Sequence, residues 1–162
     1  MSSAATLHLI CGKIAAGKST LARKLAETPG TILLSEDFFL SRLYKDEQKT
    51  LDDYARNSAR LREVIGPLIV DLLKAGLSVV LDFPANTVVR RQWMRSLFEA
   101  AGAAHVLHFL DLPDDLCRVR MHQRNADGGH DFAVTDAEFD QFTSYFVTPT
   151  AGEGFDTKTY RD

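Results

Sequence analysis

Residues 11–20 read CGKIAAGKST, and within them the pattern G-x-x-x-x-G-K-[S/T] is complete. The apolar run Thr6–Cys11 precedes this stretch, and leucines at helical spacing follow it. A strand, a glycine-rich loop and a helix, in that order, are the context in which this pattern binds phosphate. The stretch therefore predicts a phosphate-binding loop at the start of an α/β domain.

The side chains and backbone of this loop suit a nucleotide. Glycines let successive backbone N–H groups turn inward, and the following helix adds positive potential at its N-terminus. Lys18 can reach the terminal phosphates, and the hydroxyl of Ser19 can ligate Mg²⁺. We therefore expect ATP with Mg²⁺. The residues predicted to bind the nucleotide are Gly12, Lys13, Ile14, Ala15, Ala16, Gly17, Lys18, Ser19 and Thr20.

Apolar runs and amphipathic stretches alternate along the rest of the chain. The predicted strands span residues 6–11, 31–35, 77–82, 104–112 and a terminal 154–160. The predicted helices span residues 18–27, 52–74, 88–102, 114–124 and about 136–147. No linker or repeat interrupts this alternation, so residues 1–162 are predicted to form one α/β domain, with a parallel sheet covered on both faces.

Two segments of this pattern need comment. The helix predicted over residues 52–74 has an apolar side, and Pro67 is expected to kink it. Residues 38–50 are mixed in character and are predicted to form a loop or an irregular insertion. The apolar side of the long helix comprises Leu61, Ile65, Leu68, Ile69 and Leu72.

The composition limits the classes of function. The 162 residues are 45% hydrophobic and 25% charged, which is typical of one globular domain. A net charge of −3 argues against sequence-independent binding along nucleic acid, although a short end could be gripped locally. Cys11 and Cys117 form neither a disulfide framework nor a zinc-site pattern. Without a signal peptide or an apolar run of about 18 residues, we expect a cytoplasmic protein outside the membrane, as a monomer or small homo-oligomer.

Four segments together resemble small P-loop kinases: CGKIAAGKST, LLSEDFF, VVLDFPANT and LDLPDDLCRVRMHQRN. The resemblance is to the group that contains polynucleotide kinase, zeta toxins and chloramphenicol phosphotransferase, and within it to bacterial ATP-binding proteins with a Walker A motif. It spans nearly the whole chain, but only the first segment is diagnostic alone. It implies a three-layer P-loop NTPase fold with a five-stranded parallel sheet in the order 2-3-1-4-5.

Carboxylates follow two of the predicted strands. In the resembling kinases an aspartate after the second strand accepts the proton of the acceptor hydroxyl, and Asp37 stands at that position. The carboxyl ends of parallel strands also line the crevice where ligands bind. Glu36 is the rival for this role, and capping or solvating a loop stays open for both acids.

Asp82 ends the apolar strand SVVLD and fits the acid that, together with Ser19, holds Mg²⁺, here through a water molecule. The residues after it, Pro84, Asn86 and Thr87, either shape an acceptor pocket or form an ordinary strand-to-helix turn. His105 and His108 lack the spacing of a metal site and are predicted to lie in the core or at an edge.

Arginines mark a possible lid over the site. Arg120 and Arg124 are four residues apart and share one helical face, whereas Arg118 points elsewhere. Similar kinases close two such arginines on the transferring phosphate, while a solvated face is the alternative. The segment NADGGHD favours a lid around residues 114–134, since two glycines without an apolar anchor make a mobile loop.

The function predicted from these features is transfer of the γ-phosphate of ATP to a hydroxyl of a small molecule or a nucleic-acid end. The predicted catalytic residues are Asp37, Lys18, Arg120 and Arg124. The alternatives are a nucleotide-binding switch or ATPase without a dedicated acceptor, in which Asp37 positions water, and a noncatalytic nucleotide-binding protein. The sequence leaves the acceptor open, and residues 38–57 are predicted to select it.

Overall fold

The computed structural model of the chain describes residues 4–128 and 133–161. The strands are β1 (Thr6–Gly12), β2 (Thr31–Ser35), β3 (Ser78–Pro84), β4 (Ala104–Leu110) and β5 (Thr157–Tyr160). The helices are α1 (Lys18–Ala26), α2 (Glu36–Leu43), α3 (Leu51–Lys74), α4 (Val88–Ala101), α5 (Asp114–Asp127) and α6 (Asp136–Ser144), with a short 3-10 helix, η1 (Ala151–Glu153).

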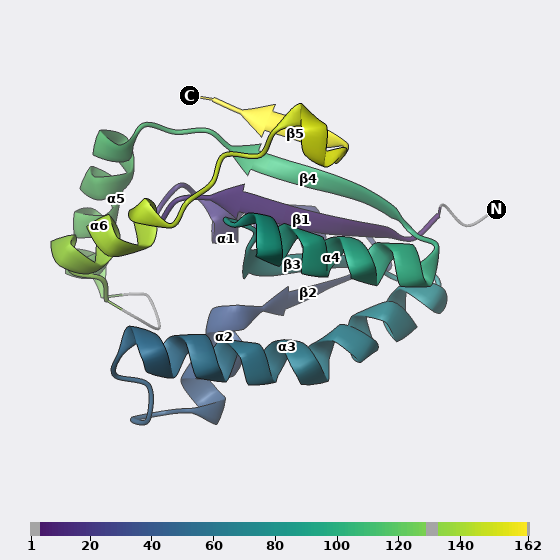
Figure 1. Cartoon of the computed structure of the whole chain (residues 1–162), viewed down its shortest axis with the longest axis horizontal. Coiled ribbons are helices and arrows are strands. Elements are labelled where there is room, and N and C mark those ends of the chain that lie inside the picture. The colour runs from purple at the N-terminus through teal and green to yellow at the C-terminus, as the bar shows by residue number, and fades with distance from the viewer. Residues whose placement is uncertain (1–3, 129–132, 162) are drawn as a thin grey trace.

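The strands form one parallel sheet in the order β2-β3-β1-β4-β5. The predicted fold class and strand order are therefore confirmed. β1 lies at the centre, between β3 and β4. In Figure 1 the arrowheads of β1, β4 and β5 point toward α5 and α6, so these helices lie beyond the carboxyl ends of the strands. This is the end of the sheet at which β1 runs into the predicted phosphate loop.

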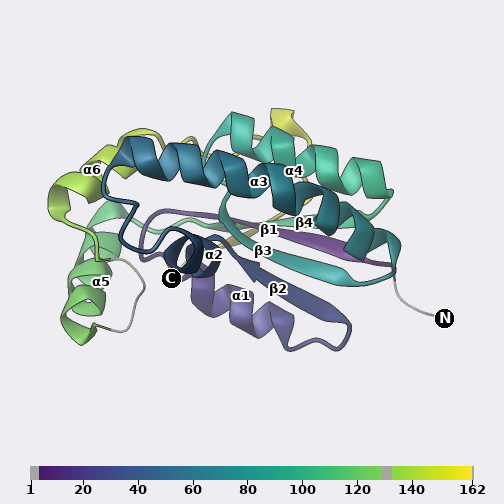
Figure 2. The same cartoon turned by 90° about the horizontal axis from the view of Figure 1, so that it is seen from below.

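Two apolar clusters cover the two faces of the sheet. The larger cluster packs Leu9 and Leu81 against α2, α3 and α4. The smaller cluster packs Ile10 and Val80, which point to the opposite face, against α1, α5 and α6. Figure 2 shows α3 and α4 on one side of the sheet and α1 on the other. Strands buried on both faces explain why the sequence shows continuous apolar runs instead of alternation.

The prediction of a loop or irregular insertion over residues 38–50 is wrong for residues 38–43, because residues 36–43 form α2. The helix is short and weakly amphipathic, but its start is well specified. The Ser35 hydroxyl accepts a hydrogen bond from the Phe38 N–H, and Glu36 and Asp37 occupy the first turn. Leu40 anchors the helix in the larger cluster. The cap places the two acids side by side at the start of a helix.

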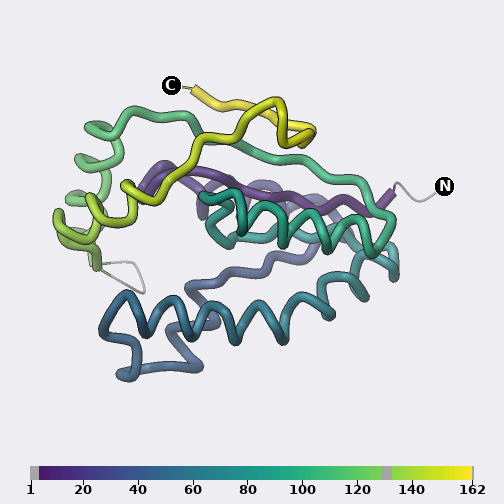
Figure 3. The backbone as a smooth tube through the Cα atoms, viewed as in Figure 1, coloured from purple at the N-terminus to yellow at the C-terminus, as the bar shows by residue number. Residues whose placement is uncertain are grey.

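Helix α3 packs along the sheet and begins at a well-specified residue. A capping box pairs Thr50 with Asp53 at its N-terminus. The helix runs through Pro67 without interruption, and the tube in Figure 3 rises toward its C-terminal end. Leu61, Ile65 and Ile69 are buried and Leu72 is half-buried, as the helical pattern predicts. The assignment of Leu68 to the core is wrong, because this side chain is 46% exposed.

The last two helices differ from their predicted bounds. Helix α5 extends three residues beyond Arg124, and Gly128 ends it in a left-handed conformation with a φ of 67°. Helix α6 ends at Ser144 instead of Val147. Residues 129–132, within the predicted lid, lie outside the described residues. In the part of the chain that is described, no helix is long and apolar enough to cross a membrane.

Candidate functional site

The loop between β1 and α1 has the backbone that the sequence motif requires. Ala15 and Gly17 adopt left-handed conformations, with φ of 63° and 102°. At Gly12 a Cβ atom would lie 3.2 Å from the Cβ of Leu110 and 3.3 Å from that of Ala16, closer than ordinary packing allows. Left-handed residues before a helix N-terminus are typical of backbone concavities that bind anions.

Lys18 folds across this loop. Its Nζ donates hydrogen bonds of 2.8 Å to the carbonyl oxygens of both Gly12 and Lys13. These bonds engage two of the three ammonium N–H donors. Burial lowers the pKa of Lys18, and the carboxylates of Asp82 and Asp37 act in the opposite direction. The ammonium group is thus fixed by backbone contacts and lies within the field of both predicted acids.

Ser19 and Asp82 meet at the end of β3. The Ser19 hydroxyl donates to Oδ2 of Asp82 over 2.9 Å. Burial raises the pKa of Asp82, while the bond from Ser19 and the charge of Lys18 lower it. Hydroxyl and carboxylate oxygens are ligands that Mg²⁺ prefers, usually one or two from the protein together with phosphate oxygens. This pair fits Mg²⁺, although no group of three or more His, Cys, Asp or Glu among the described residues forms a metal cage.

Asn86 connects the loop to the rest of the site. Its side-chain amide donates to the carbonyl of Gly12 and its Oδ1 accepts from the Gly12 N–H, at 2.8 and 3.0 Å. The register between β1 and β3 shifts after Leu9, so β3 diverges from this end of β1. The side chain of Asn86 replaces the missing strand neighbour, and its own carbonyl accepts from the Val147 N–H. The sequence left two interpretations of this turn, an acceptor pocket or an ordinary strand-to-helix turn. In the structure, the Asn86 side chain contacts the phosphate loop.

The neighbouring acids of α2 lie in different environments. Asp37 is exposed, and its charge acts on Lys18, on Tyr54 and on Arg124. Glu36 is 1% exposed and faces the interior. Sequence position alone made these two acids rivals, whereas their burial separates them clearly. Only Asp37 has a carboxylate that a molecule from solution can reach.

Glu36 belongs to a polar cluster between α2, α3 and α4. Its carboxylate accepts hydrogen bonds from the hydroxyls of Tyr54 and Ser58, the latter over 2.7 Å. Arg90 lies 3.8 Å from the same carboxylate, and Arg62 donates to the Ser58 hydroxyl. Burial, followed by the charge of Glu36, raises the pKa of Tyr54 well above its ordinary value. Sequence reasoning missed this cluster, whose one visible signal is the spacing of Tyr54, Ser58 and Arg62 on one helical face.

Arg124 projects from α5 toward the same region. Its charge interacts with that of Asp37, while burial lowers the pKa of its guanidinium. Its Nε is buried and has no hydrogen-bond partner among the described residues. Buried polar atoms are normally paired, so a water molecule, an ion or a ligand is expected to complete the hydrogen bonding of this Nε. Arg120 is half-buried on the same helix, and its charge reaches the Cys117 thiol together with those of Lys13 and Lys18.

Arg118 has a different role from these two arginines. It forms ion pairs with Asp136 and Asp140 on α6, and its guanidinium lies 4.6 Å from the centre of the Phe139 ring. The side chain of Asn125 adds bonds in both directions to the backbone of Val134. Each of these contacts links a residue before the segment 129–132 to a residue after it. Helix α5 is therefore connected to α6 and to the residue before its N-cap.

The predicted core histidines lie on the sheet, away from the loop. His108 is buried, with its ring nitrogens 2.9 Å from His8 and 2.7 Å from the Tyr160 hydroxyl. Burial lowers the pKa of His108 to about 4. His105 stacks on Phe98 at the edge of the larger cluster. These contacts agree with packing positions in the sheet.

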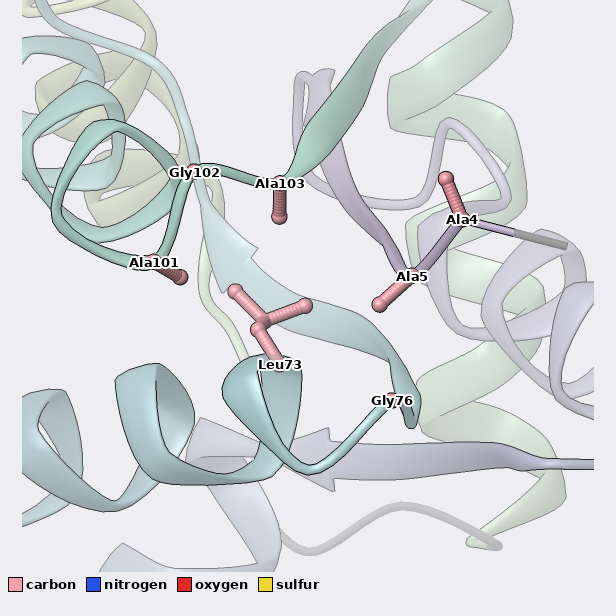
Figure 4. A pocket seen from close by; sticks show the side chains of 7 residues that line it. All are labelled: Ala4, Ala5, Leu73, Gly76, Ala101, Gly102 and Ala103. Atoms are coloured by element: carbon pink, nitrogen blue, oxygen red, sulfur yellow. The ribbon is translucent and has the colours of Figure 1, made fainter. Parts of the chain in front are cut away.

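One surface hollow lies at the opposite end of the strands from the phosphate loop. It measures about 270 Å³ and is lined by small apolar residues, including Ala5 and Ala103, at the amino ends of β1 and β4. Figure 4 shows that its walls carry no charged or hydroxyl side chain. Such a lining offers neither an acid, a base nor an anion ligand. The polar groups that could perform chemistry lie at the opposite end of the strands.

Comparison with known proteins agrees with the motif and the fold. A candidate kinase from Chloroflexus aurantiacus is 21% identical, with a TM-score of 0.75 over 97% of this chain and 85% of its own. Kti12 of Chaetomium thermophilum, solved with ADP-AlF3, is 13% identical, with a TM-score of 0.71 over 95% and 88%. The APS kinase of Mycobacterium tuberculosis, solved with AMPPNP and APS, is 21% identical, with a TM-score of 0.57 over 90% and 83%.

At these identities the structural matches establish the fold alone. No curated protein matches the sequence. The family comparison is more specific, because residues 7–149 match the AAA domain family AAA_33, from the first strand to beyond the last long helix. The chain therefore belongs to this AAA domain family.

Proposed function

We propose that the protein is an ATP-dependent phosphotransferase that moves the γ-phosphate of ATP to a hydroxyl group. The observation that carries the proposal is that Asp37 interacts with both the phosphate loop and α5. This exposed carboxylate lies within electrostatic reach of both Lys18, on the phosphate loop, and Arg124, on α5. A carboxylate beside a phosphate cradle is what transfer to a hydroxyl requires, because that hydroxyl must lose a proton.

The loop and its neighbours hold the nucleotide in this proposal. Backbone N–H groups of the loop after Gly12 would surround the phosphates, and the Lys18 ammonium would contact the terminal phosphate oxygens. Ser19 and Asp82 would hold Mg²⁺, which neutralises charge on the nucleotide phosphates when bound. Two findings support these roles: the Ser19–Asp82 contact of 2.9 Å and the position of Lys18 over the loop. Nucleotides bound to proteins of the same fold support ATP as the donor.

Asp37 acts as the general base toward the acceptor. Its exposure lets the acceptor hydroxyl approach, and it lies in the first turn of α2, at the end of the sheet that carries the phosphate loop. Glu36 does not compete for this role, because its two oxygens already accept from Tyr54 and Ser58 inside the protein. The acceptor proton moves to the Asp37 carboxylate as the acceptor oxygen attacks the phosphorus.

Arg124 and Arg120 offset the charge that develops on the phosphoryl group. The buried, unpaired Nε of Arg124 is the feature that supports this assignment. Arg120 lies on the same helix, one turn before it. In this proposal the lid around residues 114–134 is connected to α6 by the contacts of Arg118 and Asn125, so α5 and α6 would move together when it closes.

The decisive experiment follows the label of γ-labelled ATP. The purified protein is incubated with Mg²⁺ and a panel of hydroxyl compounds that includes nucleic-acid 5′ ends, nucleosides, sugars and antibiotics. A phosphotransferase places the label on one acceptor class, and Asp37→Asn abolishes this transfer while nucleotide binding persists. Label that appears only as free phosphate, at a rate that no acceptor changes, would identify an ATPase or switch instead.

A further inference from the structure

The polar cluster around Glu36 contains more positive than negative charge. Arg62 and Arg90 both donate to the Ser58 hydroxyl, over 2.7 and 3.3 Å. Their two Nη1 atoms therefore lie within about 6 Å of each other, a separation at which like charges repel. Among the described residues, Glu36 is the only carboxylate whose charge acts on Arg62. The cluster thus holds two guanidinium groups against one carboxylate.

Arg91, the next residue in the chain after Arg90, shows what a purely structural arginine looks like here. It is fully buried, and its Nε and Nη2 donate to the carboxylate of Glu153. Its Nη1 donates to the backbone carbonyls of Ala85 and Val147, both over 2.9 Å. Each nitrogen of this guanidinium has a partner, as expected of a buried charge.

Arg62 and Arg90 are not satisfied in this way. Within the described residues, the hydrogen bonds of both side chains end on the single Ser58 hydroxyl, and the ion pair of Arg90 with Glu36 is long, at 3.8 Å. Each guanidinium carries five N–H donors. Burial, and then the charge of Arg90, lowers the pKa of Arg62, so its positive charge is held at a cost. Two partly satisfied guanidinium groups, close together, are suited to bind an oxyanion with several acceptor oxygens.

The position of the pair relative to Asp37 indicates which molecule would carry this oxyanion. Asp37 directly follows Glu36 in α2, and its charge reaches Tyr54, a member of the same cluster. The same carboxylate reaches Lys18 and Arg124 around the phosphate loop. The proposed base is therefore in electrostatic contact with the phosphate loop and also with a member of the cluster that holds the two arginines.

We propose that Arg62 and Arg90 bind a phosphate-type oxyanion on the acceptor, so that the substrate is a hydroxyl compound that already carries a phosphate or sulfate group. This inference rests on the phosphotransferase function proposed above. It adds a substrate class and a recognition site to that function. The Ser58 hydroxyl accepts hydrogen bonds from both guanidinium groups and so positions them. The same hydroxyl donates its proton to the Glu36 carboxylate.

The binding experiment uses inorganic phosphate as the probe, with the protein saturated with Mg²⁺ and AMPPNP so that the phosphate loop is filled. Arginine Nε–Hε resonances are followed by NMR during the titration. The expected result is a saturable shift of the Arg62 and Arg90 signals. Arg62→Gln or Arg90→Gln weakens phosphate binding about tenfold or more, as loss of a charged hydrogen bond does.

The matched control is Arg60→Gln, which removes the same charge from an exposed position on α3. This variant is expected to bind phosphate within about twofold of the wild type, since an exposed charge two residues away contributes only a screened interaction. Equal weakening in all three variants, or no saturable shift of the Arg62 and Arg90 signals, would overturn the proposed site. Circular dichroism and the unfolding midpoint confirm that each variant is folded.

A second arm separates this inference from the function on which it rests. Hydroxyl compounds are offered in pairs that differ only by one phosphate group, and transfer from γ-labelled ATP is measured. Preference for the phosphorylated member, lost in Arg62→Gln and Arg90→Gln, supports the inference. Transfer to both members with equal kcat/KM contradicts the acceptor site but leaves the phosphotransferase intact. Absence of AMPPNP binding, or of transfer to any compound, is a failure of the proposed function instead, and the phosphate titration still decides whether the anion site exists.

Discussion

The two sides of Asp37 are built in different ways. On one side, the phosphate loop is a continuous run of nine residues whose backbone carries the binding groups, with Lys18 held by two of its own carbonyls. On the other side, the polar cluster assembles side chains from α2, α3 and α4 around one buried carboxylate. The binding groups of the loop are therefore fixed by consecutive residues, whereas the cluster depends on how three helices pack together.

The largest expected effect concerns the loop alone. Lys18→Ala removes the ammonium that contacts the terminal phosphates, and we expect turnover to fall by about 10² to 10³, as for other electrostatic groups at a transition state. Lys24→Ala, an exposed lysine of the same helix, is the control. Steady-state phosphate transfer and fluorescent-nucleotide binding measure both variants. Wild-type binding and turnover in Lys18→Ala would remove the loop from the proposed mechanism.

The next effect lies at the boundary between the two sides. Asp37→Asn should lower transfer by about 10² while ATP affinity and the unfolding midpoint stay close to wild type, since the base acts on the acceptor. Asp71→Asn, at an exposed position near the end of α3, is the matched control. Transfer rates, nucleotide Kd and urea unfolding are measured for each. Transfer at the wild-type rate in Asp37→Asn would show that another group accepts the proton.

Glu36→Gln should produce the reverse pattern. Loss of the buried negative charge leaves Arg62 and Arg90 without a counter-ion and weakens the bonds from Tyr54 and Ser58. We expect the free energy of unfolding to fall by about 2–3 kcal/mol, as when one partner of a buried ionic network is removed. Urea unfolding at neutral pH tests this. A stable Glu36→Gln variant that has lost transfer would make Glu36 the base and Asp37 the structural acid.

The smallest effect is expected in a region that belongs to neither side. Burial lowers the pKa of His108 to about 4 in the folded state, whereas an unfolded histidine titrates near 6.5. Below about pH 6.5 the unfolded chain binds a proton at this residue that the folded chain excludes. The free energy of unfolding therefore decreases as the pH falls. From about pH 7 to pH 5 the loss from this group is about 2 kcal/mol.

His108→Asn should remove that share of the pH dependence, which urea unfolding across the pH range measures. The bonds of His108 to His8 and Tyr160 connect β1, β4 and β5, so the variant is also less stable at neutral pH. The comparison is therefore made on the slope of stability against pH and not on its absolute value. An unchanged slope would mean that the pKa of His108 is the same in the folded and unfolded states.

The phosphate loop and the polar cluster also differ in how well the sequence predicts them. The fold, the strand order and the loop could be predicted because their constraints fall on consecutive residues: apolar runs for buried strands, and glycines at fixed spacing for the loop. The prediction failed at α2, where the helix start is specified by an N-cap residue. Ser35 starts α2 with a single side-chain bond, and Phe38, Phe39 and Leu40 are consecutive, so they do not show the spacing of an amphipathic helix.

The side-chain cluster could not be predicted, for a physical reason. Glu36 and Asp37 are adjacent in sequence and similar in chemistry, but neighbouring helical positions point about 100° apart. One side chain therefore enters the protein while the other faces solvent. Which of the two is buried depends on Tyr54, Ser58 and Arg90, residues from other helices that only the folded chain brings together.

The strand order also determines when the chain can begin to form its sheet during synthesis. β1 and β2 emerge first, but they are not neighbours, because β3 lies between them. No strand pair of the sheet exists until Ser78–Pro84 has left the ribosome, and β1 gains its second neighbour only with Ala104–Leu110. At about 5–20 residues per second, the first strand waits several seconds for a partner. A nascent chain that stops before β3 contains the complete phosphate loop but no sheet to hold it, so nucleotide binding during translation reports the arrival of β3.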